Sequence, residues 1–274
     1  MQTKIRYLVE IAYKGTAYHG WQRQPKVTTV QQTLEETLTK ALHTNVICIG
    51  CGRTDAMVHA SQFYFHIDLA SPLTFDLAHR LNKMLPNDIS ILSYNQVGSS
   101  VHAQHTATSR TYNYLIHTKK DPQLADLSSL YQHSFNTAEM CKAVRMLASH
   151  TNFVNFCRCP SRHSSTICNI HSAKLFANKQ AEMLRFEIKA NRFLQGMVRL
   201  IVQRLIDVGS GEISIDEFSK VLNNEIKPKK VIAAYPQGLY LTKVDYPANT
   251  VIKRETSSPY FQLLSSAEWE LLSD

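Results

Sequence analysis

The sequence has no apolar run long enough to cross a membrane, and its opening residues, MQTKIRYLVE, lack the layout of a secretory signal peptide. It also has no low-complexity segment and no visible sequence repeat. Hydrophobic residues make up 44% and charged residues 19% of the 274 positions, as in soluble globular proteins. We therefore expect a cytoplasmic protein with no membrane partner.

The sequence has fewer acidic than basic residues, with 22 Asp and Glu against 30 Lys and Arg. The resulting formal charge of +8 favours a polyanionic partner, and nucleic acid is the first candidate. The cations are spread along the chain and form no basic tract, so charge alone names no binding surface.

Six cysteines in a chain without an export signal predict free thiols, not disulfides. Cys48 and Cys51 have C-x-x-C spacing, and Cys157 and Cys159 have C-x-C spacing. A zinc site built from these pairs is one alternative, although the residues typical of a zinc knuckle are absent. No helix pattern starts at Cys51, which argues against a redox motif. Buried thiols and no metal are the favoured interpretation.

Apolar periodicity predicts the regular elements of the chain. The expected strands are residues 4–13, 46–51, 61–68, 109–118, 181–190 and 238–246. The first expected helix is capped by Thr29 and Gln32 and has Val30, Leu34, Leu38 and Leu42 on one face. Further helices are expected over residues 75–85, over residues 137–149 with Thr137 as N-cap, and over residues 192–209. A last, short helix is expected to be capped by Ser214 and Glu217.

The order strand–helix–strand–helix occurs twice along the chain, with a break near residue 105. This order predicts two α+β domains, residues 1–105 and 106–274, each with an antiparallel sheet and helices on one side. The tail after Pro247 is expected to be peripheral.

The stretch GCGRTDAMVHA (50–60) places Arg53 and Asp55 in a turn that begins with Gly50 and Gly52. An aspartate in such a turn is most often a capping residue, with the arginine as its solvated partner. Here apolar residues follow Asp55, so one side of the turn is apolar. A carboxylate in that setting needs a cation or hydrogen-bond donors to stay ionised, which favours a functional aspartate.

Five segments occur in a fixed order along the chain: YKGTAYHGWQRQ (13–24), GRTDAMVHA (52–60), VHAQHTATSRTYNYLI (101–116), ANRFLQGMVRLIVQRLIDVG (190–209) and GLYLTKVDYP (238–247). In this order they resemble the tRNA pseudouridine synthase A family. The resemblance implies two ferredoxin-like or RRM-like domains that form a continuous, mainly antiparallel sheet, with helices on one side and a central active-site cleft. It also implies an isomerase that converts uridine to pseudouridine in the anticodon stem-loop of tRNA. The family works as a homodimer and uses no metal or other cofactor.

The resemblance also implies roles for individual residues. Asp55 is the catalytic carboxylate, Arg199 pairs with it, and Tyr112 stacks on the target uracil. Arg53 occupies the helix space that the flipped base vacates, and His102 touches RNA. Taken without the resemblance, each residue has an ordinary structural interpretation. Arg199 would be an exposed cation on a helix, Tyr112 an aromatic residue that packs in a strand, and Arg53 a surface arginine.

Five positions depart from the family pattern. Met57 stands where glycine is usual, and Lys14 stands where aspartate is frequent. Gln104 and His105 replace an Arg-Phe pair, and no arginine occurs at the expected spacing around Cys168. An RNA-binding paralogue that is inactive or retargeted is therefore a second hypothesis, and a zinc-dependent nucleic-acid-binding protein is a third.

Overall fold

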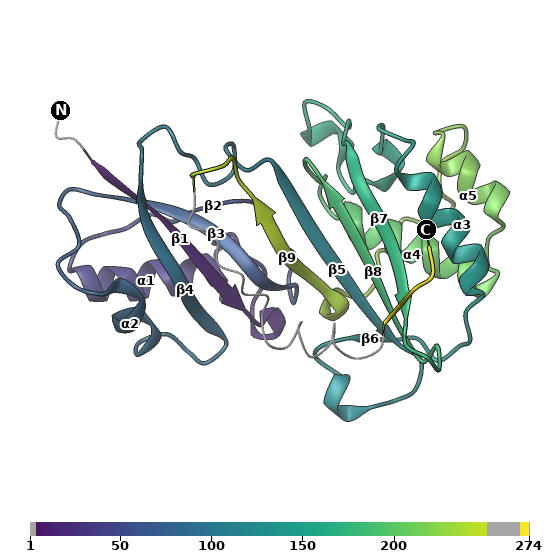
Figure 1. Cartoon of the computed structure of the whole chain (residues 1–274), viewed down its shortest axis with the longest axis horizontal. Coiled ribbons are helices and arrows are strands. Elements are labelled where there is room, and N and C mark those ends of the chain that lie inside the picture. The colour runs from purple at the N-terminus through teal and green to yellow at the C-terminus, as the bar shows by residue number, and fades with distance from the viewer. Residues whose placement is uncertain (1–3, 251–268, 274) are drawn as a thin grey trace. The chain divides into compact units, whose positions relative to one another are not determined.

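A computed structural model describes residues 4–250 and 269–273 of the chain. These residues form two compact units (Figure 1). Unit 1 comprises the chain up to Ser109 together with the segment that starts at Tyr240. Unit 2 comprises Arg110–Leu239 together with the C-terminal segment 269–273. The predicted α+β class is confirmed, whereas the ferredoxin-like division of the chain after residue 105 stays a prediction. Most of the tail after Pro247 lies outside the described residues.

Unit 1 holds a mainly antiparallel sheet in the order β9–β3–β1–β4, with the short β2 paired to β3. The strands are β1 (Ile5–Tyr13), β2 (Ile49–Gly50), β3 (His59–Leu69), β4 (Ile89–Val97) and β9 (Leu239–Asp245). The pair β3–β9 is parallel, through His59 with Tyr240 and Ala60 with Leu241. Helices α1 (Val30–Leu42) and α2 (Leu77–Asn82) belong to the same unit, and α2 packs against β4 (Figure 1).

Strand β1 lies between β3 and β4 and is buried on both faces. The alternation of Ile5, Tyr7, Val9 and Ile11 in the sequence predicts one buried face, but Leu8 and Glu10 on the opposite face are also buried. The Glu10 carboxylate accepts hydrogen bonds from Gln62 Nε2 and Ser93 Oγ, both at 2.8 Å. Because its oxygens are satisfied, a charged side chain can occupy the second face of a central strand.

Unit 2 holds an antiparallel sheet in the order β10–β7–β8–β5, with β6 parallel to β5. The strands are β5 (Ser109–His117), β6 (Ser129–Leu130), β7 (Ile170–Ala177), β8 (Met183–Ala190) and β10 (Glu270–Leu271). Helices α3 (Thr137–Leu147), α4 (Met197–Ser210) and α5 (Ile215–Leu222) pack on one another, and α3 also contacts β7. The alternating sequence of residues 181–190 predicts one buried face of β8, formed by Leu184, Phe186, Ile188 and Ala190, and all four are buried.

Four strands have no counterpart in the sequence-based prediction: the two-residue strands β6 and β10, and the longer strands β4 and β7. Strand β4 pairs only with β1 within unit 1 and is half-exposed along most of its length, so its apolar pattern is weak. In β7 the register shifts between Ile170 and Ser172, which breaks the alternation of inward and outward residues.

The ends of several helices and of one strand differ from the predicted ends. The N-cap of α3 is Asn136, whose side chain accepts from Glu139 N, and not the predicted Thr137. Helix α4 begins five residues later than predicted, at Met197, because Gly196 has a left-handed φ of 73°. The predicted strand over 46–51 is reduced to Ile49–Gly50, and the predicted helix over 75–85 is reduced to α2. The caps at Thr29 and Ser214 are confirmed.

Candidate active site

Asp55 lies in the turn between β2 and β3 of unit 1. The backbone N–H of Val58 donates to the Asp55 carbonyl at 3.2 Å and closes the turn. Thr54 is buried, with its hydroxyl 2.9 Å from the hydroxyl of Tyr13 on β1. Asp55 itself is half-buried and Arg53 is exposed. The turn therefore has a fixed base and presents the Asp55 carboxylate near the surface of unit 1.

The loop after β1 fixes this turn through its backbone. Trp21 N donates to the Thr54 carbonyl at 3.2 Å, and Met57 N donates to the Tyr18 carbonyl at 3.0 Å. These two bonds hold the turn on both sides of Asp55. The backbone that carries the Asp55 carboxylate is therefore fixed, which favours a preorganised site.

Two glycines allow the loop and the turn to approach so closely. Gly20 has a φ of 88°, and a side chain there would collide with the carbonyl oxygen of Thr54. A side chain at Gly15 would collide with the backbone of Val58. By contrast, Gly52 has open space where its Cβ would be. Both glycines lie in the segment 13–24 that resembles the family, but the sequence alone gives no reason why a side chain is excluded there.

His59, four residues after Asp55, supports the backbone. Its Nδ1 accepts the N–H of Gly15 at 3.1 Å, and its ring stacks on Tyr240 of β9 at a centroid distance of 4.5 Å. His59 is buried. These contacts give this histidine a structural role at the start of β3.

Met57 has a φ of 64°, in the left-handed region where a side chain costs free energy, and its side chain is 36% exposed. We predict that Met57→Gly raises the free energy of unfolding by about 1 kcal/mol, because the strain is relieved and little packing is lost. Urea unfolding measures the change. Met84→Gly, at another exposed methionine where no positive φ occurs, is the control and should destabilise the protein. A destabilised Met57→Gly variant would contradict the strain argument.

His102 lies in the loop that follows β4. Its Nδ1 accepts the backbone N–H groups of Gln104 and His105, at 3.1 and 3.3 Å, so the proton of the neutral ring is on Nε2. Burial, followed by the charges of His105 and Arg6, lowers the pKa of His102. The ring is therefore neutral at pH 7 and offers a hydrogen-bond donor in place of a charge.

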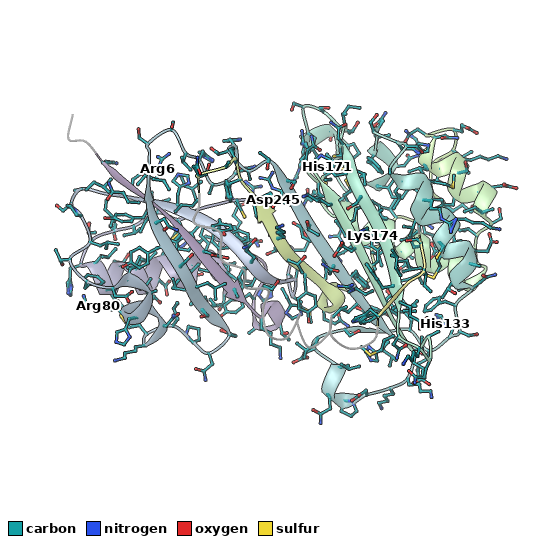
Figure 2. The ribbon with its side chains drawn as sticks, viewed as in Figure 1. Arg6, Arg80, His133, His171, Lys174 and Asp245 are labelled. Atoms are coloured by element: carbon teal, nitrogen blue, oxygen red, sulfur yellow. The ribbon has the colours of Figure 1, made fainter. Side chains whose placement is uncertain are left out.

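Arg6, labelled in Figure 2, lies on β1, and its side chain is bonded to the loop that leads to His102. Its guanidinium makes two hydrogen bonds of 2.7 Å to the Asp68 carboxylate and also donates to the carbonyls of Ser99 and Val101. The pKa of Asp68 is lowered, first by its hydrogen bond with Arg6. A planar cation shared between a carboxylate and two carbonyls fixes the loop at its base.

Tyr112 lies on β5 of unit 2 and is half-buried. Its ring meets Phe193 edge to face, with the centroids 5.1 Å apart and the planes at 87°. Tyr114 has the same strand parity and is fully buried, with its hydroxyl donating to the Tyr235 carbonyl at 2.7 Å. Tyr114 is therefore a structural residue of β5, whereas Tyr112 is only partly covered.

Arg199 lies in the first turn of α4 and is only 9% exposed. Its Nε donates to the carbonyl of Ala234 at 2.7 Å, and its own carbonyl accepts the N–H of Ala234 at 3.0 Å. Arg199 is therefore no ordinary exposed helix cation. A buried guanidinium must be paired, so it represents a fixed positive charge within unit 2.

The structure brings some of the predicted site residues together within a unit. Arg53 and Asp55 share one turn of unit 1, and His102 belongs to a different loop of that unit. Tyr112 and Arg199 lie on β5 and α4 of unit 2. Their roles in binding and catalysis stay predictions.

All six cysteines are free thiols, and all except the half-buried Cys159 are buried, as expected. Burial raises the pKa of Cys168 to about 11, so this thiol stays protonated at neutral pH. In the described part of the chain, no group of three or more His, Cys, Asp or Glu residues is placed to hold a metal ion. Nor does any helix in residues 4–250 and 269–273 have the length and apolarity to cross a membrane.

Comparison with known proteins finds close relatives along nearly the whole chain. A family profile described as tRNA pseudouridine synthase matches residues 143–247. A protein of Bacteroides thetaiotaomicron named tRNA pseudouridine synthase A is 36% identical over 262 residues, covering 94% of this chain and 97% of the relative. Proteins of the same name from Porphyromonas gingivalis and Thermoanaerobacter sp. are each 35% identical, covering 89% and 87% of this chain and 98% of each relative. A solved chain of a Cas6-RT-Cas1–Cas2 complex matches with a TM-score of 0.23 at 9% identity, too low to indicate a shared fold.

Proposed function

We propose, because the chain belongs to the tRNA pseudouridine synthase A family, that it isomerises uridine to pseudouridine in the anticodon stem-loop of tRNA. The observation that carries the proposal is Asp55 in the family's motif, on a turn whose backbone is held by hydrogen bonds to Tyr18 and Trp21. The proposed activity uses residues of both units, since Asp55 belongs to unit 1 and Tyr112 and Arg199 belong to unit 2.

The reaction exchanges one bond to C1′ of the ribose for another. The bond from C1′ to N1 of uracil breaks, the base rotates, and a bond from C1′ to C5 forms. C5 loses a proton and N1 gains one, so uridine and pseudouridine have the same atomic composition. A carboxylate near C1′ favours breaking of the glycosidic bond, and we assign this role to an ionised Asp55.

The other candidate residues are assigned to binding. We propose that Tyr112, which is only half-buried, stacks on the target uracil. We also propose that the buried Arg199 contributes the positive charge that keeps Asp55 ionised. Arg53 is exposed and is proposed to fill the space of the flipped base. His102, with its proton on Nε2, is proposed to donate a hydrogen bond to an RNA phosphate or sugar.

Two further features of the family extend the proposal. We propose that the protein acts as a homodimer and that it works in the cytoplasm, where the substrate is tRNA. Sedimentation of the purified chain measures the first of these features. The formal charge of +8 supports a polyanionic substrate.

Position-resolved mapping of pseudouridine tests the proposed specificity. Unmodified tRNA transcripts are incubated with the protein, and conversion is expected only at uridines of the anticodon stem-loop. Transcripts in which those uridines are replaced by cytidine are the control and should stay unmodified. Conversion confined to another part of the tRNA would contradict the proposed target, and tRNA binding without any conversion would favour the hypothesis of an inactive RNA-binding paralogue.

A further inference from the structure

The segment Lys227–Tyr235, between α5 and the 3-10 turn Pro236–Gly238, exposes an unusual group of side chains. Val231, Ile232 and Tyr235 are 60%, 53% and 56% exposed, among the most exposed large hydrophobic residues of the described chain. The lysines in the same segment are also exposed; they are Lys227, Lys229 and Lys230. An exposed aromatic ring that follows three cations in this way differs from the scattered apolar residues found on any surface.

The backbone of Tyr235 is firmly held, although its ring is exposed. Its carbonyl accepts from the buried Tyr114 hydroxyl at 2.7 Å, and its N–H donates to the Tyr131 hydroxyl at 3.4 Å. Its ring lies against that of Tyr131, with the centroids 5.5 Å apart and the planes at 40°. A side chain with two rotatable bonds on a fixed backbone loses little conformational entropy when a ligand packs on it.

The chain on either side of Tyr235 is fixed as well. Ala234, the residue before it, makes hydrogen bonds with Arg199 in both directions. Gly238, three residues after it, packs so closely on β5 that a side chain there would come within 2.6 Å of the Leu115 carbonyl oxygen. Tyr235 is therefore set directly beside the residue that holds Arg199, which is a candidate for substrate binding.

The charge of the segment favours RNA as the molecule that covers this ring. The only ion pair of these lysines among the described residues joins Lys229 Nζ to Glu217 Oε1 at 3.3 Å, and both groups are near the surface. Lysines beside an accessible aromatic face match a polynucleotide, because phosphates pair with the cations while any unpaired base can stack on the ring. A protein partner would be expected to bring an apolar patch and would need no such excess of positive charge.

We propose that Tyr235 is a base-stacking residue of the tRNA-binding surface: its ring stacks on an unpaired nucleobase, while Lys227 and Lys230 contact neighbouring phosphates. This inference rests on the proposed function, since it takes tRNA as the ligand. It assigns Tyr235 to binding and orientation of the substrate and gives it no part in the bond-exchange chemistry.

Affinity for tRNA tests the inference separately from catalysis. Fluorescence anisotropy with labelled tRNA should show Kd raised about 10-fold for Tyr235→Ala and nearly unchanged for Tyr235→Phe, because phenylalanine keeps the ring. Ile47→Ala, which removes an exposed apolar side chain of unit 1, is the control and should bind like wild type. In steady-state assays the same loss should raise KM, with kcat changed by less than about twofold.

The lysines are expected to change a different property of binding. Lys227→Gln and Lys230→Gln should each reduce the slope of log Kd against log salt by about 1, whereas Tyr235→Ala should leave that slope unchanged. A Kd for Tyr235→Ala equal to that of wild type would overturn the stacking role. An equal loss in Tyr235→Phe would overturn it too, because the hydroxyl would then be responsible. A wild-type protein that binds tRNA without converting uridine would refute the proposed activity while these binding ratios still decide the role of Tyr235.

Discussion

Replacing Asp55 with alanine is expected to lower the rate of uridine conversion by more than about 10³-fold while tRNA affinity stays within a few-fold of wild type. The carboxylate is the only group assigned to the glycosidic bond, so its loss removes the chemistry. Binding should persist because the backbone of the turn is held by Thr54, Met57 and Val58, whose hydrogen bonds do not use the Asp55 side chain. Single-turnover rates with saturating enzyme measure this loss, because product release does not contribute to the rate in such an experiment.

Two variants sharpen this prediction. Asp55→Asn keeps the size of the side chain and removes its charge, so it should be as inactive as Asp55→Ala. Asp216→Asn makes the same exchange at an exposed position of α5 and should be fully active. If Asp55→Asn kept a tenth of the wild-type rate, another group would have to be the catalytic carboxylate.

Replacing Gly20 with alanine is expected to destabilise the protein by roughly 3 kcal/mol and to lower activity as well. Two costs combine at this position. The φ of 88° is unfavourable for any residue with a side chain, and the added methyl would meet the Thr54 carbonyl next to Asp55. Denaturant unfolding gives the stability change, and the single-turnover rate reports the displaced turn.

Gly52→Ala is the matched control for this substitution. Gly52 lies three residues before Asp55, its φ is not positive, and its Cβ would meet no atom within 4 Å. Its replacement should change stability by less than about 0.5 kcal/mol and leave the rate unchanged. Equal effects of Gly20→Ala and Gly52→Ala would show that close approach of the two loops does not fix the turn.

Sequence patterns predicted those helices and strands whose caps and buried faces are set by residues close together in the chain. The alternation in β8 and the caps at Thr29 and Ser214 follow from neighbours a few residues away, and all three are confirmed. The α+β class followed from the order of such elements. The apolar setting of its turn indicated Asp55 as a functional residue. The other candidate site residues came only from the segments that resemble the family.

Long-range contacts explain what the sequence did not predict. The burial of Glu10 depends on Gln62 and Ser93, which are distant in the chain. The burial of Arg199 depends on Ala234, 35 residues away. Likewise, the need for glycine at position 20 arises only when Thr54 is brought against it. No periodicity in the sequence encodes these contacts.

Release of tritium from tRNA that carries 5-tritiated uridine measures the central claim most directly, because C5 must lose its hydrogen when it bonds to C1′. The wild-type protein should release tritium to water in proportion to the pseudouridine formed at its target sites, and Asp55→Ala should release none above background. Absence of release by the wild-type protein on a full set of tRNA transcripts, or undiminished release by Asp55→Ala, would contradict the account.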